Sequence, residues 1–200
     1  MVNGRAEELT ELERRLDRRV ASVLVGEAGI GKTALLRAAA DTSGAEVFEG
    51  GGLAMLSEIP YVPLTRALGE EPPEGDEGGV GAFVAERIGP DGLLLLDDLQ
   101  WADAATLAAT PFIADRVRVI AAVRRGDPAT PPVLAGLVEG GFEPLDVDPL
   151  DPDAAAKLLR AVRPGLGAGE VGRLVELAHG NPLLLLELGA GGEISETLEI

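Results

Sequence analysis

Short runs of consecutive apolar residues alternate along this chain with segments whose apolar residues recur at helical spacing. Such runs are typical of strands that are buried on both faces of a parallel sheet. We expect five strands, at about residues 21–25, 45–49, 93–97, 117–122 and 142–146. Helices are expected between them, at about residues 33–40, 80–88, 104–110 and 133–139. The alternation predicts an α/β fold, a three-layer sandwich in which helices cover both faces of a parallel five-stranded sheet.

Both ends of the chain depart from this alternation. Residues 5–19 carry charged side chains with three leucines on one side, which predicts an amphipathic helix. Beyond Pro149 the strand-like runs stop, and helical segments are expected from Asp151 or Asp153 through Arg160, at about 168–178, and over 183–188. We therefore expect a sheet domain over residues 1–149 and a small helical lid over residues 150–200.

The first chemical motif lies between the first expected strand and the first expected helix. Residues 26–33 read Gly-Glu-Ala-Gly-Ile-Gly-Lys-Thr, the pattern G-x-x-x-x-G-K-T of a phosphate-binding loop (P-loop). Its glycines let backbone N–H groups point at an anion, and the helix N-terminus favours negative charge. Lys32 can reach the β- and γ-phosphates of a nucleotide, and the Thr33 hydroxyl can ligate Mg²⁺. The residues expected to hold the nucleotide are Gly26, Ala28, Gly29, Ile30, Gly31, Lys32, Thr33 and Ala34. A glycine-rich turn followed by Lys-Thr by chance is the alternative, which the strand–loop–helix setting disfavours.

A second motif follows the apolar run at residues 93–96, where two carboxylates end the strand in the manner of a Walker B motif. Asp97 is expected at the carboxyl end of the strand, where ligands bind in open α/β sheets. It can hold the same Mg²⁺ as Thr33, directly or through water. Asp98 can polarise the attacking water. Trp101 is expected to pack in the core rather than stack on a base, and Asp103 is expected to cap the next helix, which Pro111 would end.

Arg124 closes the fourth expected strand. In the strand order 5-1-4-3-2 of P-loop proteins with an additional strand, that strand lies between the P-loop strand and the Asp97 strand, so Arg124 would approach the γ-phosphate. A pair of solvated loop arginines, Arg124 and Arg125, is the alternative. His179 has no carboxylate or thiol at ligand spacing and is expected to cap a helix end or pack in a loop.

These motifs together resemble the ATPase core of the signal transduction ATPases with numerous domains (STAND), a group of AAA-type ATPases, and in particular the large ATP-binding regulators of the LuxR type. The resemblance rests on five ordered segments, which are Gly4-Arg5-Ala6-Glu7-Glu8-Leu9, the P-loop, Leu96 to Asp103, Val123-Arg124 and Gly180-Asn181-Pro182-Leu183. It implies that Pro182 packs on adenine and that Arg5 lies near the base. The winged helix, sensor repeats and DNA-binding module of LuxR-type regulators do not follow. A fragment, a minimal nucleotide-binding domain or a degenerate stand-alone relative is therefore expected.

The composition limits the classes of partner that can be expected for this chain. A net charge of −17 argues against a nucleic-acid surface and against an anionic membrane face. The chain contains no cysteine, which excludes disulfides and thiolate metal sites. No signal peptide and no apolar run of membrane-spanning length is apparent, so a cytoplasmic location is expected. The expected partners are ATP and either a second copy of the chain or regulatory domains outside it.

The resemblance implies an ATP-binding, slowly hydrolysing signal-transduction ATPase domain that acts as a nucleotide-dependent switch, in a bacterial regulator. Its cofactors would be ATP or ADP and Mg²⁺, and its catalytic residues Asp98, Lys32 and Arg124. Asp98 is one methylene shorter than the glutamate of fast AAA-type ATPases, which favours slow hydrolysis. Two alternatives remain, a non-catalytic nucleotide-binding module and a small P-loop kinase. The sequence leaves the choice between ATP and GTP open.

Overall fold

Five parallel strands form the central sheet of the computed structural model, which describes residues 4–190. The strands are β1 (Ser22–Gly26), β2 (Val47–Gly51), β3 (Leu93–Asp97), β4 (Arg118–Arg124) and β5 (Glu143–Asp146). Their order across the sheet is β2-β3-β4-β1-β5, and every neighbouring pair is parallel. This is the predicted order 5-1-4-3-2 read from the other edge, so the predicted sheet is confirmed.

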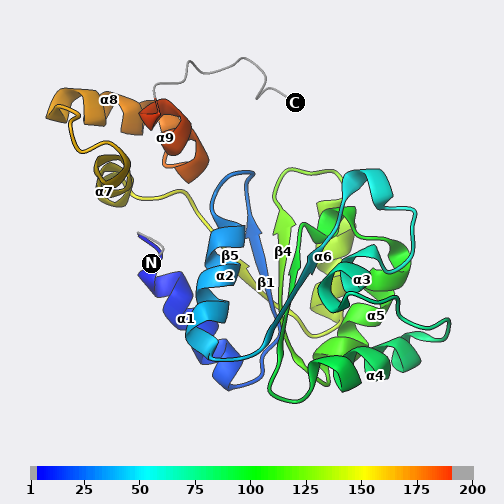
Figure 1. The fold of residues 1–200 in the computed structure, drawn as a ribbon. Coiled ribbons are helices and arrows are strands. Elements are labelled where there is room, and N and C mark those ends of the chain that lie inside the picture. Colours follow the sequence, from blue (N-terminus) through cyan, green and yellow to red (C-terminus); the bar gives the residue numbers. More distant parts are fainter. Residues whose placement is uncertain (1–3, 191–200) are drawn as a thin grey trace.

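The two faces of the sheet bury different side chains of the same strands. In β3, Leu94 and Leu96 join one apolar cluster, whereas Leu93 and Leu95 join another. This alternation is the period of two that extended backbone imposes on successive side chains. The first face is covered by α3 (Val62–Leu68), α4 (Glu77–Ile88), α5 (Ala104–Ala114) and α6 (Thr130–Glu139), and the second by α1 (Ala6–Asp17) and α2 (Lys32–Ser43), as Figure 1 shows. The predicted three-layer sandwich is therefore confirmed.

The course of α5 corrects one prediction. Pro111 was expected to end this helix, but α5 continues through it to Ala114. A proline inside a helix removes one backbone hydrogen bond and costs roughly 3 kcal/mol. Ala109 and Ile113, on either side of Pro111, are completely buried in the first cluster, and this burial holds the helix together across the break. Asp103 caps the helix as predicted, because its Oδ1 accepts the Thr106 amide at 2.8 Å.

Three further elements were not predicted. They are α3 and two short 3₁₀ turns, η1 (Ala54–Leu56) and η2 (Leu99–Trp101). All three are shorter than the window over which a helical period can be recognised. The turn η2 directly follows the two carboxylates at the end of β3, and it therefore sets the direction in which the chain leaves the sheet.

Helices α7 (Pro152–Val162), α8 (Ala168–Ala178) and α9 (Pro182–Gly189) follow the sheet. Figure 1 shows them gathered beyond the end of the sheet to which β1 and β4 point. They bury two small apolar clusters of their own, to which no residue of the sheet contributes. Asp151 and Asp153 were the two predicted N-caps of α7, and Asp151 is the residue that caps it. Its Oδ1 accepts the amides of Asp153 and Ala154 at 2.9 and 2.8 Å. Residues 191–200 of the expected lid lie outside the described residues. Across residues 4–190, no helix has the length and apolar character needed to cross a bilayer.

Candidate functional site

The P-loop connects β1 to α2 and wraps around the ammonium group of its own lysine. Gly29 and Gly31 have φ angles of 72° and 103°, in the left-handed region that favours glycine. The Lys32 Nζ donates to the carbonyl oxygens of Gly26 and Glu27, both at 2.8 Å. Lys32 is only 7% exposed, so an ammonium group is held within the loop rather than in bulk solvent.

Burial lowers the pKa of Lys32 below its ordinary value, because removal from water disfavours the charged ammonium. The carboxylates of Asp98 and Asp97 act in the opposite direction, and Arg124 and Arg125 lower the pKa further. Four charged side chains at or just after the ends of β3 and β4 therefore act electrostatically on the ammonium group of Lys32. An anion bound by the loop would favour the protonated lysine.

Thr33 and Asp97 form the part of the site that suits a hard cation. The Thr33 Oγ1 donates to Asp97 Oδ2, and the second oxygen, Oδ1, accepts the backbone amide of Asp98 at 2.8 Å. No group of three or more His, Cys, Asp or Glu side chains gathers as a metal site within residues 4–190. Mg²⁺ commonly binds through one or two protein oxygens together with water and substrate phosphates. The hydroxyl–carboxylate pair fits that donor set.

Asp98 leaves the strand in a left-handed conformation, with φ 48° and ψ 44°. This region is uncommon for residues other than glycine, but Asp and Asn enter it more readily than most. The turn directs the carboxylate of Asp98 towards Gln100, whose Nε2 donates to Asp98 Oδ1 at 2.9 Å. The orientation of Asp98 is thus set both by the backbone and by a neighbouring side chain.

Arg124 lies at the end of β4, with its guanidinium carbon 4.6 Å from the centre of the Trp101 ring. This cation–π contact holds the arginine from one side. The indole of Trp101 is itself fixed by a hydrogen bond from Nε1 to Asp127 Oδ2 at 3.1 Å. The Nε of Arg124 is buried and has no hydrogen-bond partner among the described residues. Trp101 was expected to pack in the core, and the structure shows it partly buried and in contact with Arg124.

Helix α9 approaches the P-loop through its first turn. The Asn181 Nδ2 donates to the carbonyl of Ala28 at 2.9 Å, and the amide of Leu183 donates to the carbonyl of Gly29 at 3.2 Å. A Cβ atom at Gly29 would lie 2.7 Å from the Cβ of Leu183, so this glycine is required by close approach as well as by its φ angle. Sequence reasoning gave a role to Pro182 of this segment but none to its neighbours Asn181 and Leu183.

A cavity of about 310 Å³ lies where these elements meet. It is lined by residues of the P-loop, of the ends of β3 and β4, and of α9, which are Ala28, Gly29, Gly31, Lys32, Thr33, Ala34, Asp97, Asp98, Arg124, Pro182, Leu183 and Leu186. A second cavity, of about 450 Å³, adjoins it and shares Thr33, Asp97 and Asp98. Most of the residues predicted for the site are therefore brought together at the carboxyl edge of the sheet.

Three of the predicted residues do not line this cavity. Gly26 contributes its carbonyl to Lys32, and Ile30 is buried, only 1% exposed, in the cluster beneath α1 and α2. Arg5 is 3% exposed, and its guanidinium donates to the carbonyl of Ile30 at 3.0 Å and to Glu8 at 2.7 Å. In this structure Arg5 supports the P-loop from the side of α1.

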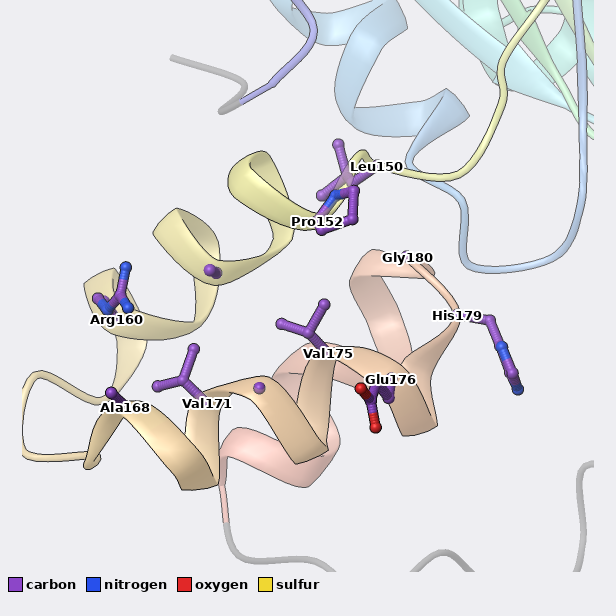
Figure 2. A pocket seen from close by; sticks show the side chains of 11 residues that line it. Leu150, Pro152, Arg160, Ala168, Val171, Val175, Glu176, His179 and Gly180 are labelled. Atoms are coloured by element: carbon purple, nitrogen blue, oxygen red, sulfur yellow. The ribbon is translucent and has the colours of Figure 1, made fainter.

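Another cavity, of about 680 Å³, lies between α7 and α8 and shares no lining residue with the P-loop cavity. Figure 2 shows Val171 and Val175 directed towards α7, whereas His179 points away from the other labelled side chains. His179 ends α8 in a left-handed conformation with φ 46°, in agreement with the helix-end role predicted for it. Neither observation indicates chemistry at this cavity.

Residues 2–75 match the AAA ATPase domain family. The matched segment contains the P-loop, β1, β2 and the helices next to them. A search of curated protein sequences found no match.

Three solved structures share the fold, all below 25% sequence identity. The STAND protein with a tetratricopeptide repeat sensor from Pyrococcus horikoshii is similar over 93% of this chain, with a TM-score of 0.59 and 21% identity. Hsp104 from S. cerevisiae, in an extended complex with casein, is similar over 95%, with a TM-score of 0.64 and 22% identity. A Walker-type ATPase of Pyrococcus abyssi is similar over 92%, with a TM-score of 0.67 and 16% identity. The chain spans 30%, 38% and 66% of these three proteins, respectively.

Proposed function

We propose that this chain is an ATP-binding domain that hydrolyses ATP slowly and acts as a nucleotide-dependent switch in a bacterial regulator of the LuxR-like STAND type. One observation carries the proposal, the convergence of the P-loop, the ends of β3 and β4, and α9 on a single cavity. Ligands of open α/β sheets bind at this carboxyl edge. The match to AAA ATPase domains over residues 2–75 supports the same conclusion.

In this proposal the nucleotide phosphates lie in the P-loop, where Lys32 and the loop amides bind them. Thr33 and Asp97 hold Mg²⁺, which when bound neutralises phosphate charge and orients the phosphate chain. Pro182, which lines the cavity, packs on the adenine. The two parts of the chain are a sheet domain over residues 1–149 and a lid over residues 150–200, which closes on the base.

Asp98 orients the water for hydrolysis. Its Oδ1 is engaged by Gln100, and we assign Oδ2 to the water proton. The water oxygen forms a bond to the γ-phosphorus as the bond between that phosphorus and the β,γ-bridging oxygen breaks. ADP leaves with the electron pair, and the water proton passes through Asp98 to solvent. The short aspartate side chain favours a slow rate, which suits a timer.

Arg124 reports the presence of the γ-phosphate in this scheme. Its guanidinium lines the same cavity as Lys32 and is held against Trp101, so an additional phosphate offers it a stronger partner. The lid conveys the result through the contacts of Asn181 and Leu183 with the P-loop. The proposed partners are ATP and either a second copy or further regulatory domains, without direct contact to nucleic acid or membrane.

Mg²⁺-dependent titration with ATP and GTP tests the proposal. Hydrogen bonds to charged groups contribute about 1.5–3 kcal/mol, so Lys32→Ala should weaken binding by roughly 10- to 150-fold. Lys157→Ala is the matched control, because Lys157 is the other lysine of the chain and is exposed on α7. Failure of the wild type to bind either nucleotide would overturn the proposal.

Hydrolysis is tested separately with Asp98→Asn, because Asn tolerates the left-handed backbone that this position requires and Ala does not. Steady-state turnover of the wild type should lie below about 1 s⁻¹, the lower end of the usual enzyme range. Asp98→Asn should abolish turnover while nucleotide binding persists. A fast wild-type ATPase would contradict the switch, and a rate unaffected by Asp98→Asn would remove Asp98 from the mechanism.

A further inference from the structure

Gln100 is a buried amide whose two ends are both occupied by parts of the candidate site. It is 4% exposed and lies in η2, directly after the two carboxylates. Its Nε2 donates to Asp98 Oδ1 at 2.9 Å, and its Oε1 accepts the backbone amide of Arg124 at 2.9 Å. Since a carboxylate only accepts and a backbone N–H only donates, these partners allow a single orientation of the amide group.

The hydrogen bond from the Arg124 amide to Gln100 extends the pairing of β4 beyond the point where β3 has ended. Strand β4 pairs with β3 up to Leu96 and Ala121, whereas on its other side it remains paired with β1 as far as Arg124. The amide of Arg125 faces β1 and donates to Gly26, so the amide of Arg124 faces the side that β3 has left. Gln100 takes the place of the missing strand and supplies the acceptor for that amide.

The contact with Asp98 fixes the direction of a carboxylate. The left-handed turn at Asp98 and the hydrogen bond from the Trp101 amide to the Asp98 carbonyl, at 3.0 Å, hold the backbone around Gln100. The side chain of Gln100 therefore has little freedom to move while Asp98 and Arg124 stay in place. A shift of the Arg124 backbone would carry Gln100, and with it the Asp98 carboxylate.

We propose that Gln100 is the positioning residue of this site, which orients the Asp98 carboxylate and ties that orientation to the end of β4 that carries Arg124. The proposal rests on the proposed function, since it concerns the water-activating carboxylate of the same ATPase. It adds a regulatory element, because the residue that senses the γ-phosphate and the residue that orients water are joined by one amide. Gln100 does not line the P-loop cavity, and its role is to act through Asp98.

Two substitutions separate the contacts. Gln100→Met has nearly the same shape and removes both hydrogen bonds. Gln100→Glu keeps an oxygen for the Arg124 amide but places a carboxylate against Asp98 when it is ionised. Thr110→Val is the matched control, because Thr110 is likewise a buried and hydrogen-bonded polar residue, but its hydroxyl donates to Thr106 within α5.

Steady-state kinetics and nucleotide titration of these variants test the proposal. Misplacement of a catalytic group by about 1 Å can cost roughly 100-fold in rate, so Gln100→Met should lower kcat by roughly 10- to 100-fold with the dissociation constant for ATP unchanged. Gln100→Glu should be as slow at neutral pH but recover part of its turnover as the pH falls. A protonated carboxyl at this position can donate to Asp98, whereas an ionised one repels it. Thr110→Val should turn over like the wild type.

The outcomes distinguish the two proposals. A wild type that binds no nucleotide overturns the proposed function, and the role of Gln100 with it. If the wild type hydrolyses ATP and Gln100→Met has the same kcat, only the role of Gln100 is overturned. If Gln100→Met does not fold, Gln100→Glu decides, since it retains the contact with Arg124. A slow Gln100→Glu variant without recovery at low pH contradicts a positioning role, because a merely structural defect would not depend on the protonation of that carboxyl.

Discussion

Asn181 both caps α9 and binds the P-loop, and its replacement should separate these two contributions. Its Oδ1 accepts the amides of Leu183 and Leu184 at 3.0 and 3.4 Å, and its Nδ2 donates to the carbonyl of Ala28 at 2.9 Å. Loss of an N-cap costs about 1 kcal/mol, and a hydrogen bond near solvent contributes roughly 0.5 kcal/mol. Asn181→Ala should therefore lower the free energy of unfolding by about 1.5 kcal/mol. Asn181→Ser keeps a capping oxygen and lacks the amide donor, so it should lose only about 0.5 kcal/mol.

Urea unfolding measures these free energies, and hydrogen exchange at the P-loop amides reports the contact itself. Both Asn181 variants should exchange faster at residues 28–31 than the wild type, because the loop loses its tie to α9. Asp151→Ala is the control, since Asp151 caps α7 with the same geometry and has no hydrogen bond to the P-loop. It should lose about 1 kcal/mol without faster exchange in the loop. Equal destabilisation by Asn181→Ser and Asn181→Ala, or unchanged P-loop exchange in both, would refute the assignment of two roles to this side chain.

Two more predictions concern charge at the site. Because burial lowers the pKa of Lys32 and bound phosphate would raise it again, ATP binding at alkaline pH should take up protons, and affinity should fall as the pH rises through the lowered pKa. Calorimetry in buffers of different ionisation enthalpy measures this uptake, and Lys32→Arg, which stays protonated, should abolish it; uptake that persists in Lys32→Arg would assign the proton elsewhere. Trp101 is the only tryptophan and lies under Arg124, so its fluorescence should change more with ATP than with ADP if Arg124 binds the γ-phosphate. Arg124→Met should remove the difference, and equal responses of the wild type to ATP and ADP would contradict the sensing role.

Features that depend on residues close together in the sequence could be predicted, whereas contacts between distant segments could not. The parallel strands and the position of the P-loop follow from local patterns in the sequence. The strand order was taken from P-loop proteins with an additional strand, and the meeting of Lys32, Asp97 and Arg124 at one edge follows from that order, because parallel strands place their carboxyl ends together. Gln100 was missed because its role depends on where β3 ends relative to β4, which no spacing in the sequence records. Its available signal was a polar residue between two apolar neighbours, Leu99 and Trp101.

Arg5 differs from Gln100, because its motif was recognised in the sequence. The motif did not, however, reveal the contact that Arg5 makes with the P-loop. The resemblance implies that the opening Gly-Arg segment lies near the base, which stays a prediction, and the structure adds that Arg5 donates to the carbonyl of Ile30. A motif indicates that two segments are neighbours, but the direction of a long side chain is set by the partners within its reach. Here Glu8, one turn along α1, holds one nitrogen of the guanidinium at 2.7 Å, and the P-loop carbonyl takes another.

The contacts between α9 and the sheet explain how a change at the phosphates could reach the C-terminal helices. Helices α7 to α9 bury apolar clusters that include no sheet residue, so their internal packing does not depend on the sheet. Hydrogen bonds from Asn181 and Leu183 join α9 to carbonyls of the P-loop itself. Contacts of this kind contribute only about 0.5–1.5 kcal/mol each, within the range that a ligand with different affinity for two arrangements can outweigh. A nucleotide that reshapes the P-loop would therefore act directly on the carbonyls that hold α9, and the helices would move as a unit with their own core intact.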